Sequence, residues 1–247
     1  MLRFLMVIFT YVLCLNAAQA TANFPEGFVY LEEVDPTIIQ NLRYYSKENF
    51  IGKRLDGYKA NRVILTRPTA LALKRAQDIL LKDGYSLVVY DAYRPQKAVD
   101  AIIKWSNNFK DQKYKEDYYP RTDKSRITNF GYFALKSPHS RGSAVDVTII
   151  SLNKTPGPII KTHRKLTNNV SMTFLDDGTV DMGTSFDLMD EASAPGSKLV
   201  LDKNRSKRAY LREVMTTVGF KPDEREWWHF LLENEMYPDT YFDFDIE

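Results

Sequence analysis

Two short blocks far apart in the chain hold most of the residues that could carry out chemistry. The first is Ser137–Asp146, with the sequence SPHSRGSAVD, and the second is Glu226–His229, with the sequence EWWH. The chain has three histidines, and two of them fall in these blocks. Two histidines and one aspartate suffice to hold a catalytic zinc, with the fourth position left to water. A glutamate three residues before a ligand is well placed to take a proton from that water.

The first block separates His139 from Asp146 by seven positions. A single buried histidine is more often a structural hydrogen-bonding group than a metal ligand. The small residues Gly142 and Ala144 lie between the two polar residues and let the backbone fold so that both side chains meet at one point. The block therefore favours metal binding over a structural histidine.

The residues of the second block also have structural explanations that involve neither catalysis nor metal binding. Glu226 ends the charged run DERE at 223–226, where a solvated acid is the simplest explanation, and His229 could be a core histidine among tryptophans. Spacing favours catalysis, because residues 226 and 229 share one side of a turn or helix, whereas Glu224 and His229 do not. We expect Glu226 to act as a base beside a metal ligand.

The first twenty residues have the pattern of a secretory signal peptide. Arg3 forms a small basic region, Phe4–Leu15 an apolar run, and Ala18–Ala20 an A-x-A cleavage site. The apolar run is shorter than the roughly 20 residues of a membrane span. A lipoprotein is the alternative, but Leu13 precedes Cys14 where a small residue is expected. The sequence predicts cleavage after Ala20 and export to the periplasm or the medium.

Composition narrows the class of the exported protein. The only cysteine of the 247 residues is lost with the signal peptide, so a hydrophobic core must replace disulfides. A hydrophobic content of 44% makes such a core feasible. The formal net charge is +2 and there is no basic stripe, so nucleic acid is not an expected partner. No later stretch is apolar enough to span a membrane, and no protein partner is evident.

The order of predicted elements indicates one α+β domain over 21–247. Residues 21–60 suggest an irregular aromatic arm, and 106–135 suggest loop with short helix. Proline and glycine signals predict helices at 68–82, from Pro95 to about Trp105, and at 205–218. Stretches rich in β-formers predict strands at 85–91 and 144–150, and turn formers within 151–180 predict an inserted hairpin or long loop. We expect helices packed on a small, mostly antiparallel sheet.

Several motifs together resemble the family of zinc D-alanyl-D-alanine dipeptidases, within the wider group of zinc D,D-peptidases. The signature S-x-H-x-x-G-x-A-x-D lies in the first block, and further family motifs follow one another in the expected order. These are DAYRP at 91–95, MGTSFD at 182–187, EWWH at 226–229 and YFDF at 241–244. The resemblance covers nearly the whole chain after residue 20, and it implies the compact α+β fold of zinc peptidases.

The resemblance also implies the roles of individual residues. His139, Asp146 and His229 would hold one zinc ion per chain, and Glu226 would be the catalytic base. Arg94 would stabilise the transition state, since a permanent charge at a strand end suits a developing oxyanion. A salt bridge to the nearby aspartate of the same motif is the structural alternative for this arginine.

A free dipeptide carries an ammonium and a carboxylate, and both ends must be recognised. Asp187 is the candidate for the ammonium, and Ser137 and Tyr44 could offer hydroxyl groups to the substrate. Capping of a loop is the alternative for Asp187 and Ser137. Packing in the core is the alternative for Tyr44.

The family implies metal-dependent hydrolysis of D-alanyl-D-alanine or a related D,D-dipeptide. Because the sequence predicts a signal peptide, we expect this activity outside the inner membrane, for scavenging or cell-wall turnover. The nearest rival is a zinc D,D-carboxypeptidase that trims peptidoglycan stem peptides. A non-catalytic peptide-binding protein of the same fold is the other alternative, although such a protein would be expected to lose a ligand or the base. The chain departs from the family in the length of the stretch between Asp146 and Met182 and in its signal peptide. Other divalent ions would also fit these ligands.

Overall fold

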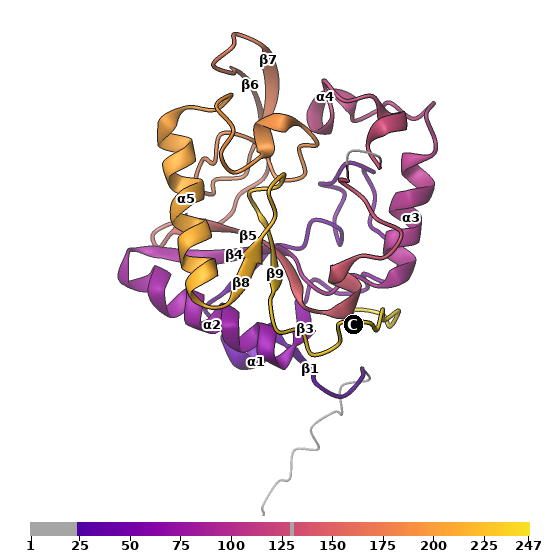
Figure 1. The fold of residues 1–247 in the computed structure, drawn as a ribbon, viewed down its shortest axis with the longest axis vertical. Coiled ribbons are helices and arrows are strands. Elements are labelled where there is room, and N and C mark those ends of the chain that lie inside the picture. The colour runs from indigo at the N-terminus through magenta and orange to yellow at the C-terminus, as the bar shows by residue number, and fades with distance from the viewer. Residues whose placement is uncertain (1–23, 129–130) are drawn as a thin grey trace, which may run out of the picture.

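A five-stranded sheet lies at the centre of the protein, in a computed structural model that describes residues 24–128 and 131–247. Its strand order is β2-β4-β5-β9-β8, and only the β2–β4 pair is parallel. Helices α2 and α5 lie together on one side, and α3 stands on the other side of the molecule (Figure 1). The predicted α+β fold with a mostly antiparallel sheet is confirmed.

The elements follow in chain order with these bounds: β1 (Phe28–Tyr30), α1 (Leu31–Val34), β2 (Ile39–Gln40), β3 (Ile64–Thr66), α2 (Arg67–Lys82), β4 (Tyr85–Asp91), α3 (Gln96–Ser106), α4 (Lys115–Tyr118), the 3₁₀ turns η1 (Lys124–Arg126) and η2 (Pro138–Arg141), β5 (Ala144–Ser151), β6 (Ile160–Lys165), β7 (Ser171–Asp176), the 3₁₀ turn η3 (Glu191–Ser193), α5 (Asp202–Thr217), β8 (Phe220–Pro222) and β9 (His229–Leu232).

The proline, glycine and β-former signals in the sequence agree with the observed positions of α2, β4 and α3. Pro68 lies in the first turn of α2, and Gly84 follows its end with a left-handed φ of 81°. Strand β4 is buried along almost its whole length, as its run of β-formers predicts. Helix α3 begins directly after Pro95.

Two predictions need correction. The arm at 21–60 is not wholly irregular, because it contains β1, α1 and β2. Strand β1 pairs with β3, more than thirty residues along the chain, and such long-range pairing leaves no local pattern. Helix α5 begins at Asp202 rather than 205, since Leu201 is extended and an acid at the next position suits a helix N-terminus.

The stretch 151–180 forms the predicted hairpin. Strands β6 and β7 pair only with each other and project from the top of the molecule (Figure 1). The turn end of the hairpin contributes Leu166 and Met172 to a small cluster of apolar side chains separate from the main core, which also contains Leu188, Ala192 and Val200. The third histidine, His163, is exposed on β6 and not on a loop.

The proposed signal peptide and Cys14 lie outside the described residues. Among the residues that the structure describes, no helix combines the length and apolar character needed to cross a bilayer.

Gly142 ends η2 in the left-handed region, with a φ of 75°. A Cβ at this position would lie 2.4 Å from Cε1 of Phe28. The carbonyl of Gly142 also accepts a hydrogen bond of 2.9 Å from the amide of Thr66. The reversal between η2 and β5 therefore requires glycine both for its φ and for space.

We expect Gly142→Ala to lower the free energy of unfolding by roughly 2 to 4 kcal/mol, since steric overlap adds to backbone strain. Gly84→Ala is the matched control, because Gly84 is also left-handed but has no atom within 4 Å of the added Cβ. Strain alone should cost about 1 kcal/mol there. Urea denaturation measures both, and equal losses would contradict the proposed overlap with Phe28.

Candidate metal centre

Strand register places three polar residues in one row across the sheet. Asp146 on β5 lies opposite Asp91 at the end of β4 and opposite His229 at the start of β9. Directly opposed residues have Cβ atoms about 4.5–5.5 Å apart. Asp91 is fully buried and Asp146 is 2% exposed. The sheet itself therefore joins the two sequence blocks.

His139 reaches this row from η2. The Ser137 hydroxyl caps η2 by accepting a hydrogen bond of 3.3 Å from the amide of His139. Nδ1 of His139 lies 2.7 Å from the carbonyl oxygen of Ala92. A neutral imidazole that donates there from Nδ1 keeps the lone pair of Nε2 for a metal.

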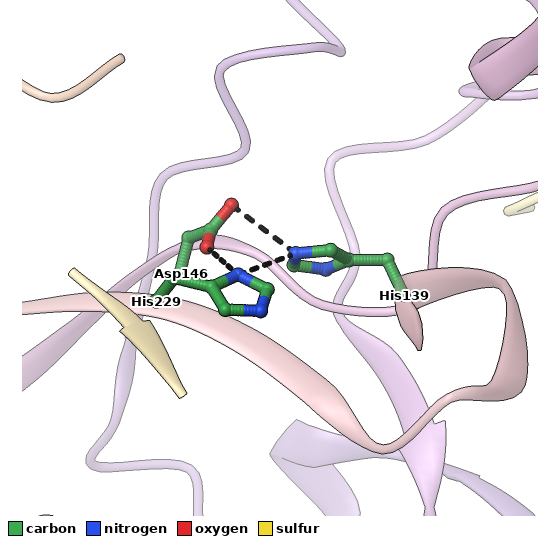
Figure 2. Close-up of side chains that lie close together, drawn as sticks. All are labelled: His139, Asp146 and His229. Atoms are coloured by element: carbon green, nitrogen blue, oxygen red, sulfur yellow. Dashed lines mark hydrogen bonds and ion pairs between the residues drawn. The ribbon is translucent and has the colours of Figure 1, made fainter. Parts of the chain in front are cut away.

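The side chains of His139, Asp146 and His229 point at one another (Figure 2). Nε2 of His139 lies 3.1 Å from Nδ1 of His229 and 3.5 Å from Oδ2 of Asp146, and Nδ1 of His229 lies 3.0 Å from Oδ1 of Asp146. Ligands at tetrahedral angles on bonds of 2.0–2.1 Å are about 3.3 Å apart. The three donor atoms therefore fit a zinc-sized ion at their centre.

Electrostatics also suit a cation at this point. Burial by itself raises the pKa of Asp146, but its interactions with His139 and His229 outweigh burial and hold that pKa below its ordinary value. The carboxylate therefore stays ionised at neutral pH. A buried carboxylate between two imidazoles offers mixed oxygen and nitrogen donors, a set that suits zinc.

A cavity of about 190 Å³ opens on this cluster. It is lined by every residue that the sequence marked as a candidate for metal binding, catalysis or substrate contact, namely Tyr44, Arg94, Ser137, His139, Asp146, Asp187, Glu226 and His229. None of residues 151–180, all of which the structure describes, lines it. The hairpin therefore does not form the wall of this cavity.

Glu226 and His229 belong to one turn, as their spacing predicts. The amide of His229 donates to the carbonyl of Glu226 at 3.2 Å. The intervening Trp227 anchors the turn through its indole, which donates to Oγ1 of Thr184 at 3.0 Å. Burial is the main reason that the pKa of Glu226 is raised to about 8. The nearby His229 lowers this pKa, and the negative charge of Asp146 raises it. Such a carboxyl is poised to exchange a proton near neutral pH.

Arg94 forms the salt bridge to Asp91 that the sequence offered as the alternative to a catalytic role. Arg94 nevertheless also lines the cavity. Its Nε and Nη2 each lie 2.8 Å from Oδ2 of Asp91, and Nη2 lies 3.5 Å from Oδ2 of Asp146. Among the described residues, none accepts a hydrogen bond from Nη1. Burial lowers the pKa of Arg94, but the charge of Asp91 outweighs burial and keeps the guanidinium charged. The salt bridge therefore aims the arginine without using all its donors.

The three candidate substrate contacts differ in their surroundings. Ser137 caps η2, as its alternative predicts, and also lines the cavity. Tyr44 packs edge-on against Phe50, and its hydroxyl donates to Oδ2 of Asp187 at 3.0 Å. Burial raises the pKa of Asp187 well above its ordinary value, and the charge of Asp146 adds to the shift. Asp187 has a φ of 60°, and no backbone amide of the described residues donates a hydrogen bond to its carboxylate. Capping of a loop therefore does not explain this residue.

Sequence reasoning missed several residues that line the cavity. Asp223 and Arg225 both precede Glu226 in the same charged run, and that position was an available signal. Tyr132 and Phe133 come from the stretch 106–135, in which no chemical motif marks them.

Residues 25–156 and 162–247 match the protein family described as D-ala-D-ala dipeptidase. The chain belongs to this family. The match is interrupted only at 157–161, inside the hairpin region.

Relatives within the D-ala-D-ala dipeptidase family cover most of the chain. A D-alanyl-D-alanine dipeptidase of Enterococcus faecalis is 37% identical over 220 residues, which make up 89% of this chain and 98% of that protein. One from Streptomyces coelicolor is 36% identical over 219 residues, with 89% and 98% covered. One from Escherichia coli is 30% identical over 211 residues, with 85% and 87% covered. The chain is accordingly a metallopeptidase.

We expect the wild-type protein to bind one zinc ion and His139→Ala to bind it more than about 100-fold less tightly, since loss of an outer partner alone costs about 10- to 100-fold. His163→Ala is the matched control, because His163 is exposed on β6 and far from the row in sequence. Competition with a chromophoric chelator measures both affinities. An unchanged affinity in His139→Ala would exclude this residue as a ligand.

Proposed function

We propose that the protein is a zinc-dependent dipeptidase that hydrolyses D-alanyl-D-alanine or a close D,D-dipeptide. One observation carries the proposal: a His-Asp-His cluster opens on a cavity that Glu226 and Arg94 also line. The relatives are named for activity on D-alanyl-D-alanine, which supports the choice of substrate.

His139, Asp146 and His229 would hold the zinc ion. A bound zinc would polarise a carbonyl oxygen and lower the pKa of a water to near neutrality. Glu226 would accept a proton from the attacking water and return it to the leaving amine. Its raised pKa suits both steps, because the carboxyl gains and loses a proton without a large energetic cost.

Arg94 stabilises the oxyanion that forms on the attacked carbonyl. Asp91 holds its guanidinium through two nitrogens, so the charge is already oriented before the substrate binds. One well-placed donor of this kind contributes about 3 kcal/mol to transition-state stabilisation.

The charge of the cavity favours a zwitterionic dipeptide. Its lining includes two arginines and four carboxylic residues, the latter being Asp146, Asp187, Asp223 and Glu226. A divalent ion offsets this excess of acids, and the substrate ammonium supplies a partner for Asp187. Tyr44 orients Asp187 through its hydroxyl, and Ser137 lies at the same wall.

The size of the cavity favours a dipeptide over a stem peptide. Pockets for larger organic ligands measure about 300–1,000 Å³, whereas this one measures about 190 Å³. A D,D-carboxypeptidase needs an open groove at the ammonium end. With Asp187 as the partner of the ammonium, the buried pair of Tyr44 and Asp187 would close that end.

Export completes the proposal. Residues 1–20 act as a signal peptide, and 21–247 form the catalytic domain, with 151–180 as an insertion. An enzyme outside the inner membrane acts on D,D-dipeptides in the periplasm or the medium, for scavenging or wall turnover.

We expect the purified protein with zinc to release D-alanine from D-alanyl-D-alanine, and to lose this activity after chelation. The L,L isomer and a stem peptide ending in D-alanyl-D-alanine are incubated in parallel, and free D-alanine is measured. Release from the stem peptide alone would move the assignment to a D,D-carboxypeptidase. No turnover of any substrate despite bound zinc would instead support a peptide-binding protein.

We expect Glu226→Gln to lower kcat by about 10²- to 10⁴-fold, because it removes the proton acceptor while keeping the shape of the side chain. Zinc content should not change. Glu224→Gln is the matched control, since Glu224 lies in the same run but pairs with Arg212 at the surface. Its kcat should stay within about twofold of wild type, because an exposed ion pair contributes little.

The same assay has a defined dependence on pH. The base must be ionised, so the rate rises as the pH passes the pKa of Glu226. Burial places this pKa above the ordinary carboxyl value of 4.5, and bound zinc pulls it partly back. A rate that stays constant as the pH falls to 4.5 would contradict Glu226 as the base.

A further inference from the structure

Asp91 joins the oxyanion arginine to a metal ligand, although it does not line the cavity. Its Oδ2 accepts a hydrogen bond from Nε of Arg94 at 2.8 Å, forms an ion pair with Nη2 at 2.8 Å, and lies 3.5 Å from Nδ1 of His139. The side chain has no exposed surface. The orientation of this carboxylate therefore helps to set where the guanidinium points, together with Asp146 and the ring of Tyr44.

Tyr58 holds the other oxygen of Asp91. The Tyr58 hydroxyl donates to Oδ1 at 2.6 Å. Among the described residues, no second donor to Oδ1 is recorded. Without this hydroxyl, a fully buried carboxylate oxygen loses its partner, which costs about 1–3 kcal/mol or drives a rotation that finds another donor.

The backbone on both sides of Tyr58 is fixed by the C-terminal segment. The amide of Ile246 donates a hydrogen bond to the carbonyl of Gly57 at 2.8 Å. The carbonyl of Ile246 accepts hydrogen bonds from the amides of Lys59 at 2.8 Å and Ala60 at 2.9 Å. Tyr58 is 1% exposed, and its ring meets that of Tyr44 edge-on at 6.0 Å. The hydroxyl thus has one defined position relative to the sheet.

We propose that Tyr58 is a positioning residue for catalysis, which acts through Asp91 to aim the guanidinium of Arg94 at the developing oxyanion. The inference rests on the proposed function, because it assumes that Arg94 stabilises the transition state. Tyr58 does not line the cavity, and its hydroxyl interacts with Arg94 as well as with Asp91. Its removal should therefore change kcat and leave substrate binding intact.

The protein contains a second network of the same chemistry that serves as a control. The Tyr90 hydroxyl donates to Oδ2 of Asp177 at 2.5 Å, and Arg43 forms a buried ion pair with the same oxygen. Tyr90 and Tyr58 are 2% and 1% exposed. None of the three residues of this second network lines the catalytic cavity. Tyr90→Phe therefore removes an equivalent hydrogen bond away from Arg94.

We expect Tyr58→Phe to lower kcat for D-alanyl-D-alanine about 10- to 100-fold, the scale of a misplacement by about 1 Å. KM and zinc content should remain unchanged. Tyr90→Phe should lower the melting temperature to a similar extent and leave kcat within about twofold of wild type. Equal kcat values in the two variants, or a lower zinc affinity in Tyr58→Phe with normal kcat at saturating zinc, would overturn the inference.

A double-mutant cycle separates this inference from the proposed function. Arg94→Ala should lower kcat by about 10²- to 10³-fold, and adding Tyr58→Phe should lower it no further, because Tyr58 acts through the missing side chain. Additive losses would mean that Tyr58 works by another route. An Arg94→Ala variant with normal kcat would instead refute the role of the arginine in the proposed function.

Discussion

The antiparallel pairing of Asp146 with both of its neighbouring strands is the constraint on which the site depends. Asp91 lies opposite it on β4 and His229 lies opposite it on β9. A slip of one residue in either pairing would turn a side chain to the other face of the sheet. The apolar residues of β5 oppose such a slip, because Val145, Val147 and Ile149 are all fully buried. The burial of these apolar side chains therefore also fixes the register that brings the site residues together.

Buried charge is the second principle of the site. An ion pair removed from water is costly unless its remaining donors and acceptors are satisfied. The chain builds a buried ion pair supported by a tyrosine twice, once behind the candidate metal centre and once beside the hairpin, and in the second pair Nε of Arg43 is buried without a hydrogen-bond partner among the described residues. At the first network Arg94 retains a donor at the cavity; at the second, Arg43 also pairs with Glu48. The same combination of residues therefore orients the charge of Arg94 at the cavity and, at Asp177, attaches the segment after β7 to the rest of the protein.

The parts of the molecule that surround the site differ in what they contribute. The C-terminal segment lies behind it: the amide of Phe242 donates to Ser140 at 2.8 Å, and Phe244 stacks on Tyr93 at 4.1 Å. These contacts fall beside His139 and Arg94 in sequence, so the end of the chain braces the two segments that carry them. The β6–β7 hairpin projects from the opposite end of the molecule and takes no part in the cavity wall (Figure 1).

The sequence alone predicted which residues form the candidate site. The residue types of the two blocks, the spacing of Glu226 and His229, and the proline and glycine signals around α2 and β4 are local properties, and the structure agrees with each of them. Only tertiary structure decided that Arg94 is held by Asp91 and that Asp91 is held by Tyr58. Those contacts join residues brought together by sheet pairing and by the return of the C-terminal segment. The pairing of β1 with β3 escaped prediction for the same physical reason, because a long-range contact is stabilised by surfaces that no single stretch of sequence contains.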